Sequence, residues 1–177
     1  MKTWSQNSVR STLKYLWICS IIVLIWQGYS SYSKLPERFA THFDISGNPD
    51  GWSSRKGFFT AWYSLLLGMN AMWLLAALLI PRTLSKTRSW MLSIPNRDYW
   101  LATDERKKEC ARLLNTMMFG ISFLTNLMWS VIYHGIIQSS IETKIHFPIW
   151  AMFVVVGVML IFTLIFLLTA FRKPAEQ

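Results

Sequence analysis

The fold is decided by residues 151–171, AMFVVVGVMLIFTLIFLLTAF, a stretch that contains no charged residue. A helix rises about 1.5 Å per residue, so about 20 apolar residues cross about 30 Å of hydrocarbon. Similar stretches recur along the chain, and backbone polar groups need internal partners in lipid. We therefore predict an all-α membrane protein, a single four-transmembrane-helix bundle. Its helices are expected at about residues 13–31, 59–80, 113–137 and 147–171.

Composition supports this class. The chain has 177 residues, of which 53% are hydrophobic and only 15% are charged. A soluble domain usually carries nearer a quarter charged residues. The composition argues against a water-soluble enzyme, a disordered tail and a nucleic-acid-binding domain. The expected partner is the lipid bilayer, with no nucleic acid.

The distribution of basic residues predicts the orientation. Most of the 18 Lys and Arg residues lie in the N-terminal arm, the loop 81–112 and the C-terminal tail. Cytoplasmic segments are enriched in such residues, so both termini and this loop are expected in the cytoplasm. The loop 32–58 is then the outer loop. Pro81 is expected to end the second helix, because proline lacks the N–H that a helix interior requires.

The first apolar stretch has two interpretations. A basic start, an apolar core and the small residues Gly28 and Ser30 are typical of a cleaved signal peptide. Trp17, Trp26 and Gln27 fit that pattern poorly, so we favour a retained helix. Cleavage would instead leave three helices and an outer N-terminus.

The outer loop is polar and patterned. Residues 34–58 read KLPERFATHFDISGNPDGWSSRKGF. A strand is expected from residue 38 to 45, with apolar and polar side chains on opposite faces (Phe39, Phe43 and Ile45 against Arg38, His42 and Asp44). Residues 48–51, Asn-Pro-Asp-Gly, favour a type I turn. We therefore expect a strand–turn unit that caps the helices on the outer side.

This loop supplies the candidate binding residues: Arg38, His42, Asp44, Asp50, Trp52 and Lys56. His42 and Asp44, two apart on a strand, would point the same way, and a carboxylate can orient an imidazole. The alternative is a polar surface pair. We expect no metal and no cofactor. The residues that could complete a zinc-like site are His42, Asp44, His134 and His146.

The cytoplasmic loop leads into the third helix. Thr103 is a plausible N-cap, followed by Asp104 and Glu105 where negative charge suits the helix dipole, so this helix should begin near Asp104. The candidate cytoplasmic motif comprises Asn96, Tyr99, Trp100 and Arg106. Its aromatic residues are expected at the membrane interface, and a docking surface for a cytoplasmic regulator is the alternative.

The third helix carries a polar face: Asn115, Ser122, Asn126, Ser130 and Tyr133. Their spacing of 7, 4, 4 and 3 residues places them on one side of a helix. Polar groups avoid lipid, so this face should contact other helices or line a wet cavity. No charged residue lies at the centre of any predicted span, which argues against a proton-driven pump.

The outer loop resembles a known family. Pro36, His42, Phe43, Gly47, Asp50, Gly51, Trp52 and Lys56 follow the signature of the domain-of-unknown-function 1648 family of small bacterial membrane proteins. The segment from Asn96 to Arg106 is also similar to the cytoplasmic segment of that family. The resemblance implies a multi-pass protein of the bacterial cytoplasmic (inner) membrane. Related immunity proteins against a secreted sporulation killing factor protect the membrane from a toxic peptide and sequester a repressor.

Two functional hypotheses follow. The first is a non-enzymatic membrane protein whose outer loop recognises an extracytoplasmic peptide, in immunity or sensing. The second is a small transporter, or an accessory subunit of a membrane complex, that uses the polar face of the third helix. An enzyme is not expected, because the sequence contains none of the common catalytic motifs.

Overall fold

The computed structural model describes residues 2–84, 93–141 and 149–172. The order of elements is α1 (Lys2–Ser31), a 3-10 turn η1 (Tyr32–Lys34), β1 (Arg38–Phe43), β2 (Pro49–Ser54), α2 (Arg55–Leu84), α3 (Arg97–Leu101), α4 (Asp104–Ile141) and α5 (Ile149–Ala170). Within these described ranges, α1, α2, α4 and α5 are long and apolar enough to cross a membrane. The predicted fold class is therefore confirmed.

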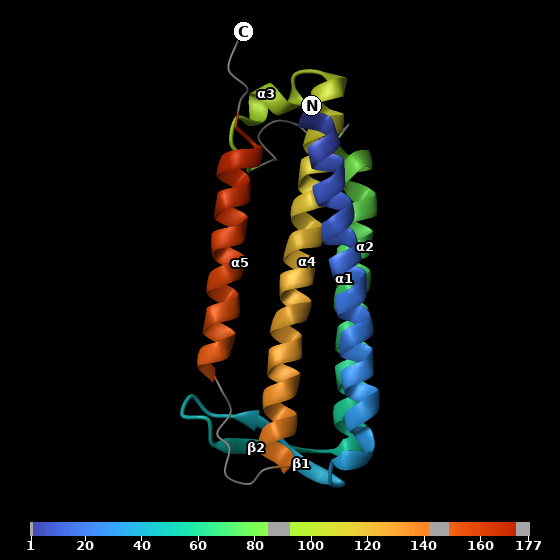
Figure 1. The fold of residues 1–177 in the computed structure, drawn as a ribbon, viewed down its shortest axis with the longest axis vertical. Coiled ribbons are helices and arrows are strands. Elements are labelled where there is room, and N and C mark those ends of the chain that lie inside the picture. The colour runs from blue at the N-terminus through green and yellow to red at the C-terminus, as the bar shows by residue number, and fades with distance from the viewer. Residues whose placement is uncertain (1, 85–92, 142–148, 173–177) are drawn as a thin grey trace.

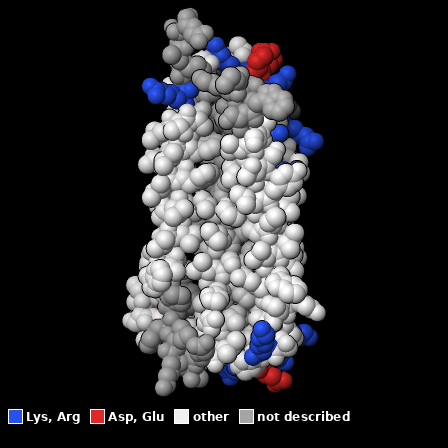
Figure 2. Space-filling view, viewed as in Figure 1, with Lys and Arg blue, Asp and Glu red and all other residues white. Residues whose placement is uncertain are grey.

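The four long helices run side by side, as Figure 1 shows. Helix α4 is central, because it packs against α1, α2 and α5. The two chain ends and α3 lie at one end of the bundle, and the two strands lie across the other. We call these the terminal end and the hairpin end. Charged side chains gather at both ends of an uncharged band in Figure 2, as expected for a bilayer-spanning molecule.

The helices extend beyond the predicted apolar stretches. Helix α2 continues through Pro81 to Leu84, so the prediction that Pro81 ends it is wrong. A proline removes one hydrogen bond from a helix, and neighbouring groups can compensate for that loss in a membrane helix. Helix α4 begins at Asp104 as expected, and the Arg106 N–H donates to the Thr103 hydroxyl at 3.3 Å.

Two apolar clusters hold the bundle together. The first cluster lies at the hairpin end, where aromatic rings of α2 and α4 pack with residues of β1 and of the segment before it. The buried members of this cluster include Leu35, Phe39, Phe58, Phe59, Trp62, Leu66 and Tyr133. The second cluster lies at the terminal end, where the start of α4 packs against α3 and the end of α5. The buried members of this cluster include Leu84, Trp100, Cys110, Leu113, Met117 and Phe171. These clusters fix the positions of the strands and of α3 on the bundle.

The strands form an antiparallel hairpin, with Arg38 opposite Ser54 and Ala40 opposite Trp52. Its turn runs from Asp44 to Asn48, so the prediction of a turn at residues 48–51 is wrong. Gly47 has a φ of 83°, a conformation that favours glycine. The expectation that Ile45 joins an apolar strand face is also wrong, because Ile45 lies in the turn and is 87% exposed.

The Asp44 carboxylate organises this turn. It accepts hydrogen bonds from the Asn48 backbone N–H at 2.8 Å and from the Asn48 side-chain amide at 3.2 Å. The first of these bonds is the main reason why the pKa of Asp44 lies below its usual value of 3.8. The carboxylate is therefore ionised at neutral pH and accepts both hydrogen bonds from Asn48.

Candidate functional site

The hairpin is anchored firmly to the helices. The Phe39 ring is buried, and its centroid lies 5.1 Å from that of Phe58. Arg55, at the start of α2, donates from its guanidinium to the Leu35 carbonyl at 2.9 Å and from its backbone N–H to the Glu37 carbonyl at 2.8 Å. The Ser140 hydroxyl of α4 donates to the Ala40 carbonyl at 3.4 Å. These contacts hold the hairpin in a fixed position on α2 and α4.

One face of the hairpin points away from the core. Phe39 faces the core, and side chains alternate along a strand, so Arg38 and Ala40 face outward. Directly opposed residues share a face, which puts Trp52 beside them. Trp52 is 53% exposed, and Arg38 is also exposed. Lys56 is exposed in the first turn of α2. Sequence-predicted candidates from both strands are thereby displayed at the hairpin end.

His42 is paired with Asp50 and not with Asp44. Its Nδ1 lies 2.5 Å from the Asp50 Oδ1, and both side chains are exposed. The expected His42–Asp44 pair is therefore not formed, because Asp44 is engaged by Asn48 in the turn. Gly51 makes the new pair possible. A Cβ at Gly51 would lie 2.9 Å from the Cβ of His42, so a larger residue would displace the imidazole.

A cavity of about 290 Å³ lies between the hairpin and the helices. The hairpin contributes His42, Phe43 and Asp44 to its lining, and α4 and α5 contribute Ile136 and Met152. The cavity has apolar walls with polar groups from the strand. The sequence does not reveal this cavity, because no local pattern indicates which helix faces a strand from the other side.

The candidate metal residues are not assembled in the part of the chain that the structure describes. No group of three His, Cys, Asp or Glu side chains there lies close enough to hold a metal ion. His134 is exposed on α4, and His146 lies outside the described residues. The pairing of His42 with Asp50 is the interaction that the structure assigns to this histidine.

The polar face of α4 contacts α1 and α2. Asn126 is 1% exposed; its amide donates to Asn70 Oδ1 at 3.1 Å and to the Ser20 hydroxyl at 2.9 Å. Asn70 donates back to Asn126 Oδ1 at 3.2 Å and accepts from Trp17 Nε1 at 2.7 Å. We call Trp17, Ser20, Asn70 and Asn126 the buried polar cluster. Trp17 and Asn70 were missed, although a lone Asn in an apolar stretch is a usable signal.

The other residues of this face are arranged differently. Ser130 donates to Gln27 Oε1 at 3.0 Å, and the hydroxyls of Tyr133 and Ser31 are hydrogen-bonded. Ser122 is buried and donates to the Met118 carbonyl of its own helix at 2.6 Å. Asn115 has a buried Oδ1 without a partner. The polar face therefore links helices over most of its length and ends in an unsatisfied amide oxygen.

Two residues of the candidate cytoplasmic motif form hydrogen bonds to the C-terminal end of α5. Asn96 Nδ2 and Trp100 Nε1 both donate to the Phe171 carbonyl at 3.1 Å. The last carbonyls of a helix lack internal partners, so these bonds satisfy one of them. Trp100 is 3% exposed, so its expected place in an interfacial belt is wrong. The guanidinium of Arg106 lies 4.1 Å from the centroid of the Tyr99 ring.

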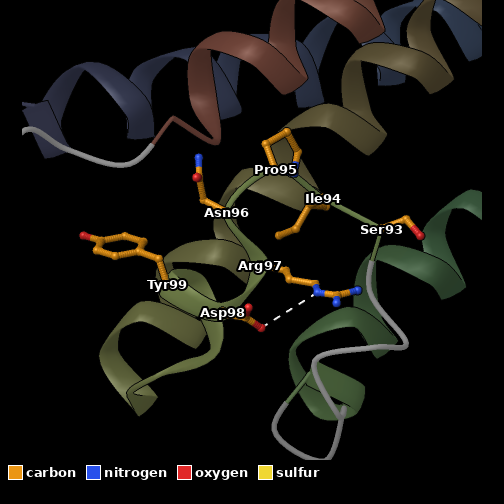
Figure 3. Close-up of a pocket in the computed structure, with 7 residues that line it drawn as sticks. All are labelled: Ser93, Ile94, Pro95, Asn96, Arg97, Asp98 and Tyr99. Atoms are coloured by element: carbon orange, nitrogen blue, oxygen red, sulfur yellow. Dashed lines mark ion pairs between the residues drawn. The ribbon is translucent and has the colours of Figure 1, made fainter.

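Next to this contact, residues 93–99 line an open depression of about 610 Å³, drawn in Figure 3. The dashed line in that view marks the ion pair between Arg97 Nε and Asp98 Oδ1, at 3.8 Å. Asn96 adopts a left-handed conformation with a φ of 54°, which turns the chain into α3. The depression follows the curve of residues 93–99, and the charged side chains of this segment, Arg97 and Asp98, are exposed.

Comparison with known proteins gives one match. Residues 18–67 match the model of a family described as "Domain of unknown function (DUF1648)". The matched region contains the C-terminal part of α1, the whole hairpin and the first part of α2. No curated protein and no solved structure shows a significant match to the chain. The match supports the family resemblance of the outer loop, and the candidate residues of the hairpin all lie within it.

Proposed function

We propose that the protein is a non-enzymatic membrane protein whose hairpin recognises a partner outside the cytoplasm. The observation that carries this proposal is the hairpin's outward face. The hairpin displays Trp52 and Arg38 on this face and the exposed His42–Asp50 pair near its turn, on a backbone that is anchored by Phe39 and Arg55. Rigid display of an aromatic ring beside charged groups is typical of a binding surface, because little conformational entropy is lost on binding.

The chemistry of this surface favours an amphipathic peptide. The ring of Trp52 offers an apolar contact, and the His42–Asp50 pair and Arg38 offer polar ones. The neighbouring cavity has room for an apolar side chain beside His42 and Asp44. In a bacterial cytoplasmic membrane with both termini in the cytoplasm, the hairpin would meet peptides that reach the membrane from outside. An immunity or sensing role towards an envelope-active peptide fits this arrangement.

The proposal is tested by the double variant His42→Ala, Trp52→Ala. Cells that produce the wild-type protein should tolerate a membrane-active peptide at concentrations that inhibit cells without it. The double variant should lose this protection, because both the Trp52 ring and the His42–Asp50 pair are removed. The measurement is the inhibitory concentration across a panel of amphipathic peptides, together with the amount of protein in the membrane.

Trp26→Ala is the matched control, because Trp26 is an exposed ring on α1 and is not part of the hairpin. It should leave protection unchanged. A double variant that reaches normal abundance and still protects as well as the wild type would contradict the proposal. A wild-type protein that protects against no peptide of the panel would contradict the immunity role.

A further inference from the structure

A second surface lies at the terminal end, far from the hairpin. There α1, α2 and α4 enclose a cleft of about 670 Å³. Its polar lining comes from Arg10 of α1 and from Lys107, Lys108, Arg112 and Asn115 of α4. Pro81, Leu84 and Ala111 provide an apolar wall. We call this the basic cleft.

The basic cleft carries uncompensated positive charge. Asp104 is the acidic residue of its lining, and it lies 3.4 Å from Lys107 Nζ. Arg10, Lys108 and Arg112 form no ion pair with any acidic residue that the structure describes. Like charges gathered around one cleft repel each other, and an anion bound between them relieves that repulsion. The charge therefore indicates an anionic ligand.

The depth of the cleft indicates where that anion comes from. Arg112 is the last charged residue of α4, and residues 113–141 contain none. Arg10 precedes the apolar part of α1, and Pro81 follows the apolar part of α2. The cleft therefore lies where the apolar parts of the helices end, which is the level expected for lipid phosphates. Basic pockets between membrane helices at this level bind anionic headgroups.

Asn115 indicates a second property of the ligand, namely a hydrogen-bond donor. Its Oδ1 is buried and has no hydrogen-bond partner, although the residue lines the cleft. A buried acceptor without a partner is costly, so a ligand that brings a donor is favoured. A phosphate diester has only acceptor oxygens at neutral pH. The donor must therefore come from another group of the ligand, and a headgroup hydroxyl is suitable.

We propose that the basic cleft binds the headgroup of an anionic phospholipid that combines a phosphate with a hydroxyl, as phosphatidylglycerol does. Arg10, Lys108 and Arg112 contact the phosphate. Asn115 accepts a hydrogen bond from the headgroup hydroxyl. The apolar wall of Pro81, Leu84 and Ala111 lies against the glycerol backbone and the first carbons of the chains. This site is independent of the hairpin and of the function proposed for it.

The test uses the full-length protein purified in an uncharged detergent. Thermal unfolding is followed while phosphatidylglycerol, phosphatidylcholine or inorganic phosphate is added. Phosphatidylglycerol should raise the unfolding temperature, and the other two should not. In the double variant Lys108→Gln, Arg112→Gln, the concentration of phosphatidylglycerol that gives half of the shift should rise by about tenfold or more.

The matched control is Lys56→Gln, Arg97→Gln, which also removes two exposed cations but none from the cleft. It should respond to phosphatidylglycerol like the wild type. Arg112→Lys, which retains the charge, separates loss of charge from loss of fold and should keep most of the response. In Asn115→Leu, the preference for phosphatidylglycerol over phosphatidylmethanol, a phosphate diester without a headgroup hydroxyl, should disappear.

Three results would overturn the proposal. The first is an equal loss of response in the cleft variant and in its control, which would mean a non-specific charge effect. The second is an equal shift with phosphatidylcholine, which would mean a requirement for lipid in general. The third is an equal shift with inorganic phosphate, which would assign the cleft to a soluble anion.

Discussion

At the scale of the residue, Asn126 shows how a polar side chain is used inside this bundle. The spacing of polar residues in α4 places Asn126 on an inward face, but it does not identify the residues that it meets. Those are Asn70, which lies 56 positions earlier in the chain, and Ser20 of α1. An amide exchange between α2 and α4 fixes their axial register, because the two side chains bond only at one depth. The geometry supports a packing role for this face.

Replacing Asn126 by Leu should lower the free energy of unfolding by about 1 kcal/mol, because Asn70 and Ser20 lose a partner in an apolar environment. The double variant Asn70→Leu, Asn126→Leu should cost less than the sum of the two single variants, since neither amide is then left alone. Unfolding in detergent micelles measures both quantities. Normal abundance and stability of Asn126→Leu, with loss of a transport activity, would instead favour the transporter hypothesis.

At the scale of the element, α5 depends on close contact with α4. Val155 is the buried residue of α5, and most of its other side chains point outward. The ring of Phe162 lies directly against Gly120 of α4, where an added Cβ would be 2.7 Å from the Phe162 Cε1. At the terminal end, Asn96 and Trp100 bond the Phe171 carbonyl. Helix α5 is thus placed by a glycine contact at mid-length and by α3 at its end.

Two glycine substitutions should therefore have opposite effects. Alanine is favoured over glycine in a helix by up to about 1 kcal/mol. Gly157→Ala should therefore stabilise the protein, because the added Cβ would have no described atom within 4 Å beyond its own stretch of helix. Gly120→Ala should destabilise it, because the Phe162 ring must move. Thermal unfolding of the two variants side by side measures the difference. An equal gain in both would mean that α5 does not pack on Gly120.

At the scale of the whole molecule, the two ends of the bundle carry different elements and surfaces. The terminal end carries both chain ends, α3 and the basic cleft, and the hairpin end carries the strands. The excess of Lys and Arg in the segments around the terminal end predicts that this end faces the cytoplasm. The recognition proposal depends on this orientation, because the hairpin must meet partners from outside.

Cysteine labelling tests the orientation. In a background with Cys19→Ser and Cys110→Ala, Ser46→Cys in the exposed hairpin turn should react with a membrane-impermeant thiol reagent in intact cells. Ala102→Cys, exposed between α3 and α4, should react only after the cells are permeabilised. The reverse pattern would mean that the hairpin faces the cytoplasm, and the recognition proposal would then be wrong.

The sequence by itself determined the class of protein, the approximate helices, the strand at Arg38 and the start of α4 at Asp104. Hydropathy, alternation and capping depend on residues within a few positions of one another, so they can be read locally. Only the tertiary structure decided that His42 pairs with Asp50, that Asn70 meets Asn126, that Trp100 bonds the end of α5, and that Arg10 joins Arg112 around a cleft. These contacts join separate segments, and packing selects them from many combinations that the local pattern allows equally.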